Sequence, residues 1–245
     1  MMIADDEPPA FEIVNPTGAA PVLLLCDHAS RRIPRALGDL GLGDEDLARH
    51  IAWDIGAGDV TRRLAARLGA PAVLCSYSRL VIDCNRHLHD PGIIVEASDG
   101  TPVPGNHALG EGDRDARIEG IWRPYHQAIA QQLHGRDAVT VLSIHSCTPQ
   151  LRHGPARPWH IGICWETDRR LATPVLAALR RRTDLVVGDN EPYALDGRED
   201  YTIPVHAMAR GLRHLQVEFR QDLIATLEGA ARHADILFEA LAPEL

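Results

Sequence analysis

The sequence predicts a single α/β domain of 245 residues with three layers, α/β/α, and a mixed but mostly parallel central sheet. Three observations predict this fold class. Short, almost continuous apolar runs alternate with amphipathic stretches, as in parallel sheets covered by helices on both faces. Hydrophobic residues make up 45% of the chain, enough for a sizeable core. No repeat, low-complexity tract or linker divides the chain, and we expect residues 1–18 to be a poorly ordered or edge extension.

The first half of the chain predicts alternating strands and helices. PVLLLCDHAS, residues 21–30, is typical of a buried parallel strand. Helical spacing predicts one long helix over residues 44–69 and another over 112–136. Residues 70–83 predict one or two strands, and AVTVLSIHS, residues 138–146, predicts a further buried strand.

The second half continues this alternation. We predict strands over residues 159–166, 185–190 and 212–219, and helices over residues 168–183, 202–211 and 220–242. The segment 98–114 is rich in Gly, Pro and Asp without apolar periodicity, so we predict a long loop, equally compatible with a lid and with a surface excursion. Ligands of such sheets bind beyond the carboxyl ends of the strands, so residues that follow strands are the first candidates for a site.

The composition excludes several functional classes. The net charge is −9, from 25 basic and 34 acidic residues, which argues against a nucleic-acid partner. All the basic residues are arginine, which excludes a lysine nucleophile. The acidic start MMIADDEPPA is not a signal peptide, and no apolar run reaches the ~18 residues of a membrane helix. We therefore expect a cytoplasmic protein without a membrane partner, whose scattered cysteines are reduced and buried in strands: Cys26, Cys75, Cys84, Cys147 and Cys164.

Polar side chains follow three of the predicted strands: Asp27 and His28, His145 and Ser146, and Glu218 to Arg220. A further acidic residue, Asp54, lies in or at the start of the first long helix. Two histidines and a carboxylate are a common catalytic zinc set, which leaves one coordination position open for water. Each residue also has a structural interpretation, since Asp54 is compatible with a helix terminus and Glu218 with an arginine partner. Their coincidence after very apolar runs favours a common site, because uncompensated polar groups are costly there.

A second polar cluster lies in SRLVIDCNRH, residues 78–87. It places Arg79, Asp83, Asn85 and Arg86 at the end of an apolar run. Two guanidinium groups beside an amide suit bidentate recognition of a carboxylate. Asp83 is equally compatible with a role in neutralising one of the arginines.

At these residues the chain resembles the N-formylglutamate amidohydrolase family. The resemblance covers roughly residues 20–225 and lies in the segments LLCDHASRRIP, HIAWDIGA, SRLVIDCNR, SDGTPVPGN, WRPYH, SIHSCTP and VEFRQDLI. The family is itself similar to zinc carboxypeptidases and aspartoacylase, which implies an α/β fold with a mixed central sheet.

The resemblance also implies roles for individual residues. It implies one divalent metal ion, Zn²⁺, bound by His28 and His145, with Glu218 as the general base. SRLVIDCNR looks like the Arg…Asp-x-Asn-Arg segment with which aspartoacylase holds its substrate carboxylate. We therefore expect the substrate to contact the side chains of Arg79, Asn85, Arg86, Ser146 and Arg220.

The remaining metal ligand departs from the pattern of the carboxypeptidases. They take a ligand from a glutamate three residues after the first histidine, and here that position is Arg31, which cannot bind a cation. We assign the role to Asp54 on the following helix, as in cell-wall amidases of similar fold, which use a glutamate. Asp27 is the rival candidate.

The activity that the resemblance implies is hydrolysis of N-formyl-L-glutamate, a small carboxylate-bearing N-acyl substrate, to formate and L-glutamate. Two alternatives stay open: the same chemistry on another N-acyl amino acid or peptide-like amide, and a non-catalytic carboxylate-binding protein. A nucleophilic hydrolase using Ser146 or Cys147 beside His145 is disfavoured. Neighbouring residues of a strand point to opposite faces, and the sequence has no GxSxG motif.

Overall fold

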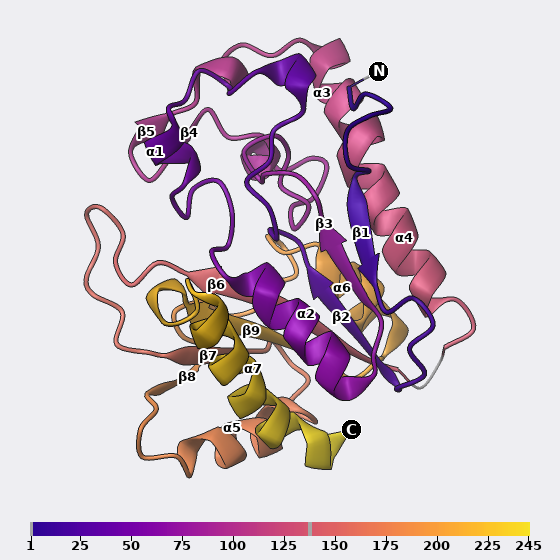
Figure 1. Ribbon diagram of the computed structural model, residues 1–245, viewed down its shortest axis with the longest axis vertical. Coiled ribbons are helices and arrows are strands. Elements are labelled where there is room, and N and C mark those ends of the chain that lie inside the picture. Colours follow the sequence, from indigo (N-terminus) through magenta and orange to yellow (C-terminus); the bar gives the residue numbers. More distant parts are fainter. Residues whose placement is uncertain (1, 137–138) are drawn as a thin grey trace.

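A seven-stranded sheet runs through the computed structural model, which describes residues 2–136 and 139–245 (Figure 1). Its strands lie in the order β1 (Phe11–Val14), β3 (Ala72–Cys75), β2 (Val22–Cys26), β6 (Thr140–Cys147), β9 (His214–Arg220), β7 (Ile161–Cys164) and β8 (Val187–Asp189). The four strands from β3 to β9 are parallel, whereas β1 and β7 are antiparallel to their inner neighbours. The predicted mixed sheet is therefore confirmed, and part of the expected N-terminal extension forms its edge strand β1.

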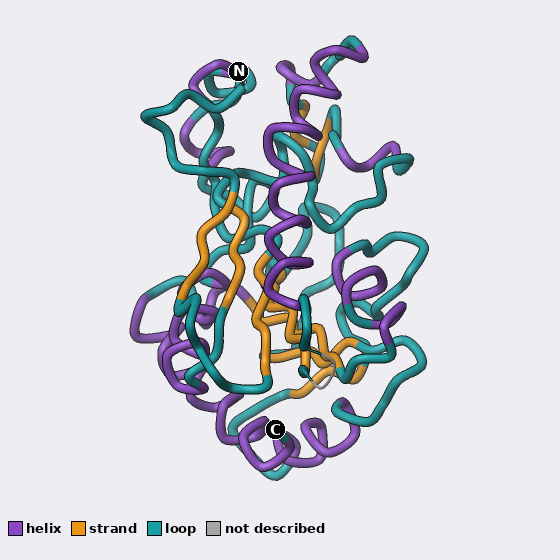
Figure 2. The backbone as a smooth tube through the Cα atoms, turned by 90° about the vertical axis from the view of Figure 1, so that its right-hand side faces the viewer, coloured by secondary structure: helices purple, strands orange, loops and turns teal. Residues whose placement is uncertain are grey.

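Helices cover both faces of this sheet, as predicted. They are α1 (Asp44–Leu47), α2 (Ala57–Leu68), α3 (Glu111–Arg117), α4 (Arg123–Leu133), α5 (Ala172–Arg180), α6 (Thr202–His206) and α7 (Leu227–Leu241). Figure 2 shows the side of the molecule that carries α4, with this helix running alongside the strands. In the described parts of the chain, no helix is long and apolar enough to cross a membrane.

The two faces of β2 enter two separate hydrophobic cores, which explains its continuous apolar sequence. Leu23 and Leu25 pack in the core beneath α4, whereas Val22 and Leu24 pack with residues of α2, α5 and α7. A strand that is buried on both faces favours apolar side chains at every position, and all five residues of β2 are apolar. The first polar residues can therefore appear only where the strand ends, at the edge of the sheet where a ligand can bind.

The predicted helix over residues 44–69 is wrong in its middle. It is two helices, α1 and α2, separated by turns. Gly56, which precedes α2, has a φ of 79°, and a Cβ there would lie 2.1 Å from the carbonyl oxygen of Ile224. The sharp turn at this glycine is thus compatible only with the smallest residue. As a result Asp54 lies before α2 rather than within a helix, and its backbone N–H donates to the carbonyl of His28 at 2.9 Å.

Two other predictions are met only in part. Residues 70–83, predicted to form one or two strands, form one, β3, and the chain then makes turns over residues 76–83, although Leu80 and Val81 are fully buried there. The residues 98–114 are not a structureless loop, because a small hairpin of β4 (Ala97–Ser98) and β5 (Thr101–Pro102) occupies their first part. The five cysteines are free and buried, as expected, but Cys84 lies in the turns after β3 and not in a strand.

Candidate active site

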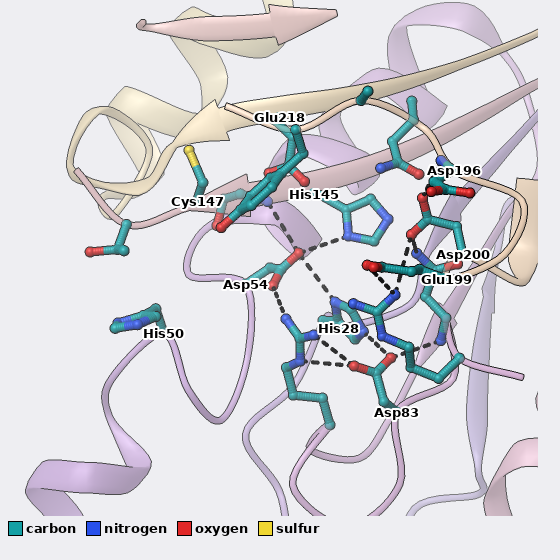
Figure 3. A pocket seen from close by; sticks show the side chains of 18 of the residues that line it. His28, His50, Asp54, Asp83, His145, Cys147, Asp196, Glu199, Asp200 and Glu218 are labelled. Atoms are coloured by element: carbon teal, nitrogen blue, oxygen red, sulfur yellow. Dashed lines mark hydrogen bonds and ion pairs between the residues drawn. The ribbon is translucent and has the colours of Figure 1, made fainter. Parts of the chain in front are cut away.

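His28, His145 and Glu218 converge from three neighbouring parallel strands (Figure 3). His28 follows β2, His145 is near the end of β6, and Glu218 is its partner in register on β9. The carboxyl ends of neighbouring parallel strands meet at one edge of a sheet, so a position after each strand becomes a shared site. The rule that singled out these residues in the sequence is the reason that they meet in the fold.

Asp54 completes a group that can hold a metal ion. Its Oδ2 atom lies 2.9 Å from Nδ1 of His145 and 3.4 Å from Nδ1 of His28. All three residues are 3% exposed, and one potential ligand atom from each lies within 4.8 Å of the others. Ligands about 2.0–2.1 Å from a tetrahedral zinc ion lie about 3.3 Å from one another. The three atoms therefore fit such an ion in number and type, and the two distances to the carboxylate oxygen lie close to that spacing.

The other ring nitrogen of each histidine lies against a second carboxylate. Nε2 of His28 is 2.7 Å from Oδ1 of Asp83, and Nε2 of His145 is 3.2 Å from Oδ2 of Asp27. Such carboxylates behind histidine ligands fix the orientation of the rings. This arrangement turns both Nδ1 atoms toward Asp54. Asp27, the rival candidate for the ligand, lies behind His145 instead.

The histidines and carboxylates of this site strongly affect one another's pKa values. Burial and the charge of Arg79 act to lower the pKa of His28, but the carboxylates of Asp83 and Asp54 outweigh them and raise it to about 9. Burial acts to raise the pKa of Asp54, but His28 and His145 hold it well below its usual range. The neighbouring carboxylates thus raise the pKa of both imidazoles. A metal ion held by these residues would displace protons from the imidazoles.

Glu218 differs from the other described acidic residues because one of its carboxylate oxygens is fully buried and has no hydrogen-bond partner. The residue is 6% exposed, and within the described ranges its Oε2 atom is buried without a hydrogen-bond partner. Burial raises the pKa of Glu218 to about 7. An unpaired buried carboxylate oxygen costs free energy, so in a native protein it indicates a ligand or water that the residue serves.

The SRLVIDCNR segment supports the site from one side. The guanidinium of Arg79 donates to Oδ2 of Asp83 at 2.6 Å and lies 3.7 Å from Oδ1 of Asp54. Asp83 thus neutralises an arginine, as in the structural interpretation, and also orients His28. Asn85 donates to Asp200 at 2.9 Å, so its amide holds the segment that follows β8.

These groups line a cavity of about 210 Å³. Pockets for drug-sized ligands usually measure about 300 to 1,000 Å³, so this cavity suits a small molecule. Every residue predicted for the site lines it except Arg220, namely His28, Asp54, Arg79, Asn85, Arg86, His145, Ser146 and Glu218. The lining also contains residues that sequence reasoning missed, among them Thr148, Arg157, Tyr193, Asp196, Glu199 and Asp200. They follow β6 and β8 in segments without an apolar pattern, and only their place after predicted strands could have drawn attention to them.

Arg220 does not reach the cavity, and its placement gives no support to a role in substrate binding. Its side chain donates to Asp222 at 2.8 Å and to the carbonyl of Arg157 at 3.3 Å. Arg220 therefore ties the chain after β9 to the segment that carries Arg157. Asp222, two residues further along the chain, binds the side chain of Arg220, which the sequence pattern had assigned to the site.

Neither candidate nucleophile of the β6 end is activated. Burial raises the pKa of Cys147 to about 12, so the thiol stays protonated at neutral pH. The hydroxyl of Ser146 donates to the carbonyl of Ile55 at 2.9 Å, away from the ring of His145. This geometry continues to disfavour the nucleophilic hydrolase.

A mixed α/β sheet with two histidines, an aspartate and an unpaired glutamate at its carboxyl edge defines an enzyme-like fold with a candidate metal site. Comparison with known proteins defines its class further. The model of the N-formylglutamate amidohydrolase family matches residues 20–225. The chain belongs to this family of hydrolases, which confirms the resemblance seen in the sequence.

Individual relatives agree with this membership. The N-formylglutamate deformylase of Pseudomonas aeruginosa is 31% identical over 199 residues, which cover 74% of this chain and 72% of that protein. The enzyme of the same name from Pseudomonas putida is 34% identical over 129 residues, which span 47% of this chain and 46% of that protein.

Solved structures confirm the fold. Gene product Atu2144 from Agrobacterium tumefaciens is 35% identical, with a TM-score of 0.93 over 99% of both chains. N-formylglutamate amidohydrolase from Ralstonia eutropha JMP134 is 21% identical, with a TM-score of 0.66 over 97% of both chains. At that identity the second likeness concerns the fold alone.

Proposed function

We propose that this protein is a zinc-dependent amidohydrolase that cleaves N-formyl-L-glutamate to formate and L-glutamate. The observation that carries the proposal is the meeting of His28, His145 and Asp54 beside the unpaired carboxylate oxygen of Glu218. Membership of the N-formylglutamate amidohydrolase family and the names of the Pseudomonas relatives support the choice of substrate.

His28, Asp54 and His145 would hold the metal ion. Two imidazoles and one carboxylate are a ligand set that zinc commonly takes in hydrolases, with one position left open. When bound, the ion would polarise the amide carbonyl and make water more acidic. Asp83 and Asp27 would keep the two imidazoles turned toward it.

Glu218 is the general base of the proposed reaction. Its unpaired oxygen accepts a proton from the water that attacks the formyl carbon, and the same carboxyl then delivers this proton to the leaving nitrogen. A pKa of about 7, raised by burial, suits a group that must both take up and release a proton near neutral pH. The carbon–nitrogen bond breaks, and formate and the free amine of glutamate leave.

The arginines of the cavity would serve the negative charges of the substrate. Arg79, which is already held by Asp83, would stabilise the negative oxygen that develops on the carbonyl. Arg86 would bind a substrate carboxylate, with Asn85 fixing the neighbouring segment and Ser146 lining the same cavity. The small volume of the cavity favours a formyl group over a large acyl group.

A substrate panel with zinc-loaded and chelator-treated protein tests this proposal. We expect release of the free amino acid from N-formyl-L-glutamate to be faster than from N-acetyl- or N-succinyl-L-glutamate. It should be lost with the chelator and restored by added zinc. Full activity of metal-free protein would show that the mechanism is wrong, and a faster N-acetyl or N-succinyl substrate would show that the formyl assignment is wrong.

A further inference from the structure

Three arginines line the cavity, and they differ in how their charge is balanced. Arg79 is paired with Asp83 at 2.6 Å, and Arg86 lies 3.7 Å from Glu199 and 3.9 Å from Asp200. Arg157 has no carboxylate oxygen within 4.0 Å among the residues that the structure describes. It is thus an uncompensated cation in the wall of a cavity whose other arginines have acidic neighbours.

The guanidinium of Arg157 is fixed by neutral partners. It donates to the hydroxyl of Tyr193 at 2.6 Å and to the carbonyl of Thr148 at 3.3 Å. Its central carbon lies 4.8 Å from the centre of the Tyr193 ring. These two hydrogen bonds use two of the five N–H donors of an arginine and leave its charge intact. A cation that is held in place without being neutralised is prepared to bind an anion.

Arg157 and Arg86 lie toward opposite ends of the cavity. Figure 3 shows Cys147 on one side of the group of His28, Asp54 and His145, and Glu199 and Asp200 on the other. Arg157 belongs to the Cys147 end through its bond to the adjacent Thr148, and Arg86 belongs to the acidic end through its neighbours there. The candidate metal site therefore lies between two arginines.

We propose that Arg157 binds a second carboxylate of the substrate, so that the cavity recognises an N-acylated dicarboxylic amino acid at two points. This inference rests on the proposed function. The α- and γ-carboxylates of an N-acylated glutamate diverge from one carbon, which suits two anion sites on either side of the reacting amide. Arg86 has two carboxylates within 4.0 Å, whereas Arg157 has none among the described residues, so no nearby carboxylate offsets the attraction of Arg157 for an anion. Tyr193 is a positioning residue, since it acts through Arg157.

Equilibrium binding of the product and its two amides tests the proposal without any turnover. L-Glutamate, L-glutamine and L-isoglutamine differ only in which carboxylate is replaced by a neutral amide. Calorimetric titration of the zinc-loaded protein should show that Arg157→Gln lowers the binding affinity for L-glutamate by about tenfold to a hundredfold. The same variant should leave the affinity for one of the two amides unchanged, namely the amide that lacks the carboxylate bound by Arg157.

Matched variants separate this role from a structural one. Arg152→Gln changes an exposed arginine of the same loop, which donates to the carbonyl of Gly100 outside the cavity lining, and should leave all three affinities unchanged. Arg157→Lys, which keeps the charge, should restore part of the affinity for L-glutamate, and Tyr193→Phe should weaken it less than Arg157→Gln does. In turnover of N-formyl-L-glutamate, Arg157→Gln should raise KM and leave kcat within about threefold.

The outcomes distinguish this inference from the function on which it rests. Three results would each overturn the role of Arg157. The Arg157→Gln variant could lose affinity for all three ligands equally, or lose no affinity for L-glutamate. The wild-type protein could also bind L-glutamate no more tightly than its amides. If the wild-type protein hydrolyses no N-acyl amino acid and the selective loss persists, the proposed function fails and the dicarboxylate site stands.

Discussion

The Nε2 atom of His28 lies 2.7 Å from Oδ1 of Asp83, a residue 55 positions further along the chain. The contact joins the end of β2 to the turns after β3 and leaves Nδ1 of His28 facing Asp54. A buried carboxylate behind a histidine stabilises the orientation in which the ring can bind a metal. This contact therefore connects the SRLVIDCNR segment, through the ring of His28, to the proposed metal site at the end of the neighbouring strand β2.

Replacement of Asp83 by asparagine should weaken zinc binding. The amide would keep the size of the side chain but lose the charge that holds the ring of His28, so we expect the zinc affinity to fall by about tenfold to a hundredfold. Competition with a chromophoric chelator measures this change. Asp59→Asn, at an exposed position of α2, is the control and should leave the affinity as it is. An unchanged affinity in the Asp83→Asn variant would exclude this role of the carboxylate.

Replacement of Glu218 by glutamine should separate metal binding from turnover. Because the carboxylate is expected to move a proton rather than bind zinc, the variant should keep its metal while the rate falls by about 10²–10⁴-fold. Metal analysis and steady-state kinetics on the same sample test both halves of this expectation. Glu239→Gln, on the exposed face of α7, should alter neither quantity. Loss of zinc from the Glu218→Gln variant would instead make this residue a ligand.

Much of the fold and the centre of the site follow from the sequence because the same constraint shapes both. A strand buried on both faces is mostly apolar, as β2 is throughout, so ionisable side chains after β2 and near the ends of β6 and β9 stand out as His28, His145 and Glu218. The proposed third ligand, Asp54, was harder to predict. Asp54 precedes α2, and the start of this helix depends on the turn at Gly56. Ile51 and Ala52 are buried in the core, so their apolar side chains continue the helical pattern across the turn, and the sequence gives no sign of the break.

The rim of the cavity could not be predicted in the same way. Arg157 and Tyr193 lie in irregular segments, and their contact depends on how two loops pack. Arg220 stands at a strand end, as His145 and Glu218 do, but its side chain donates to Asp222 instead of lining the cavity. The pattern of a sequence indicates which residues are buried and which helices and strands form. Tertiary packing decides which of two nearby groups a side chain contacts.

The buried pair of His126 and His206 should make the protein sensitive to mild acid. Nδ1 of His126 lies 3.0 Å from Nε2 of His206, and Nε2 of His126 lies 2.8 Å from the carbonyl of Cys84. Burial lowers the pKa of His126 to about 3 and that of His206 to about 4. In the unfolded chain both return to about 6.5, so the unfolded state takes up protons first as the pH falls. The stability that this pair contributes is therefore complete above pH ~6.5 and is lost progressively as the pH falls below it.

Urea unfolding of the zinc-free protein between pH 6.5 and 5 measures this effect. Each histidine that stays neutral in the folded state adds a slope of up to about 1.4 kcal/mol per pH unit. His206→Gln should reduce the slope by about one such contribution, whereas His134→Gln, at an exposed position, should not change it. Comparison with the wild-type protein cancels the groups that both proteins share. Identical slopes in the wild-type and His206→Gln proteins would show that His206 takes up its proton in the folded state as it does in the unfolded chain.

Two glycines that flank α2 allow the turn before Asp54 to be tested against a matched position. Both have positive φ, 79° at Gly56 and 63° at Gly69, but a Cβ at Gly56 meets the carbonyl oxygen of Ile224 at 2.1 Å, whereas a Cβ at Gly69 meets nothing within 4 Å. We therefore expect Gly69→Ala to lower the free energy of unfolding by about 1 kcal/mol, which is the cost of a left-handed alanine. Gly56→Ala should lower it by about 3 kcal/mol or more, because the clash adds to that cost.

Zinc affinity supplies a second readout for the same pair of variants. The turn at Gly56 sets the position of Asp54, whose Oδ2 must stay within reach of both imidazoles, so Gly56→Ala should weaken zinc binding even where the protein remains folded. Gly69→Ala changes the far end of α2 and should bind zinc like the wild-type protein. If the two variants lose stability equally and bind zinc equally, the contact with Ile224 does not set the geometry of the ligand. A selective loss in Gly56→Ala would show that the break between α1 and α2 builds the site.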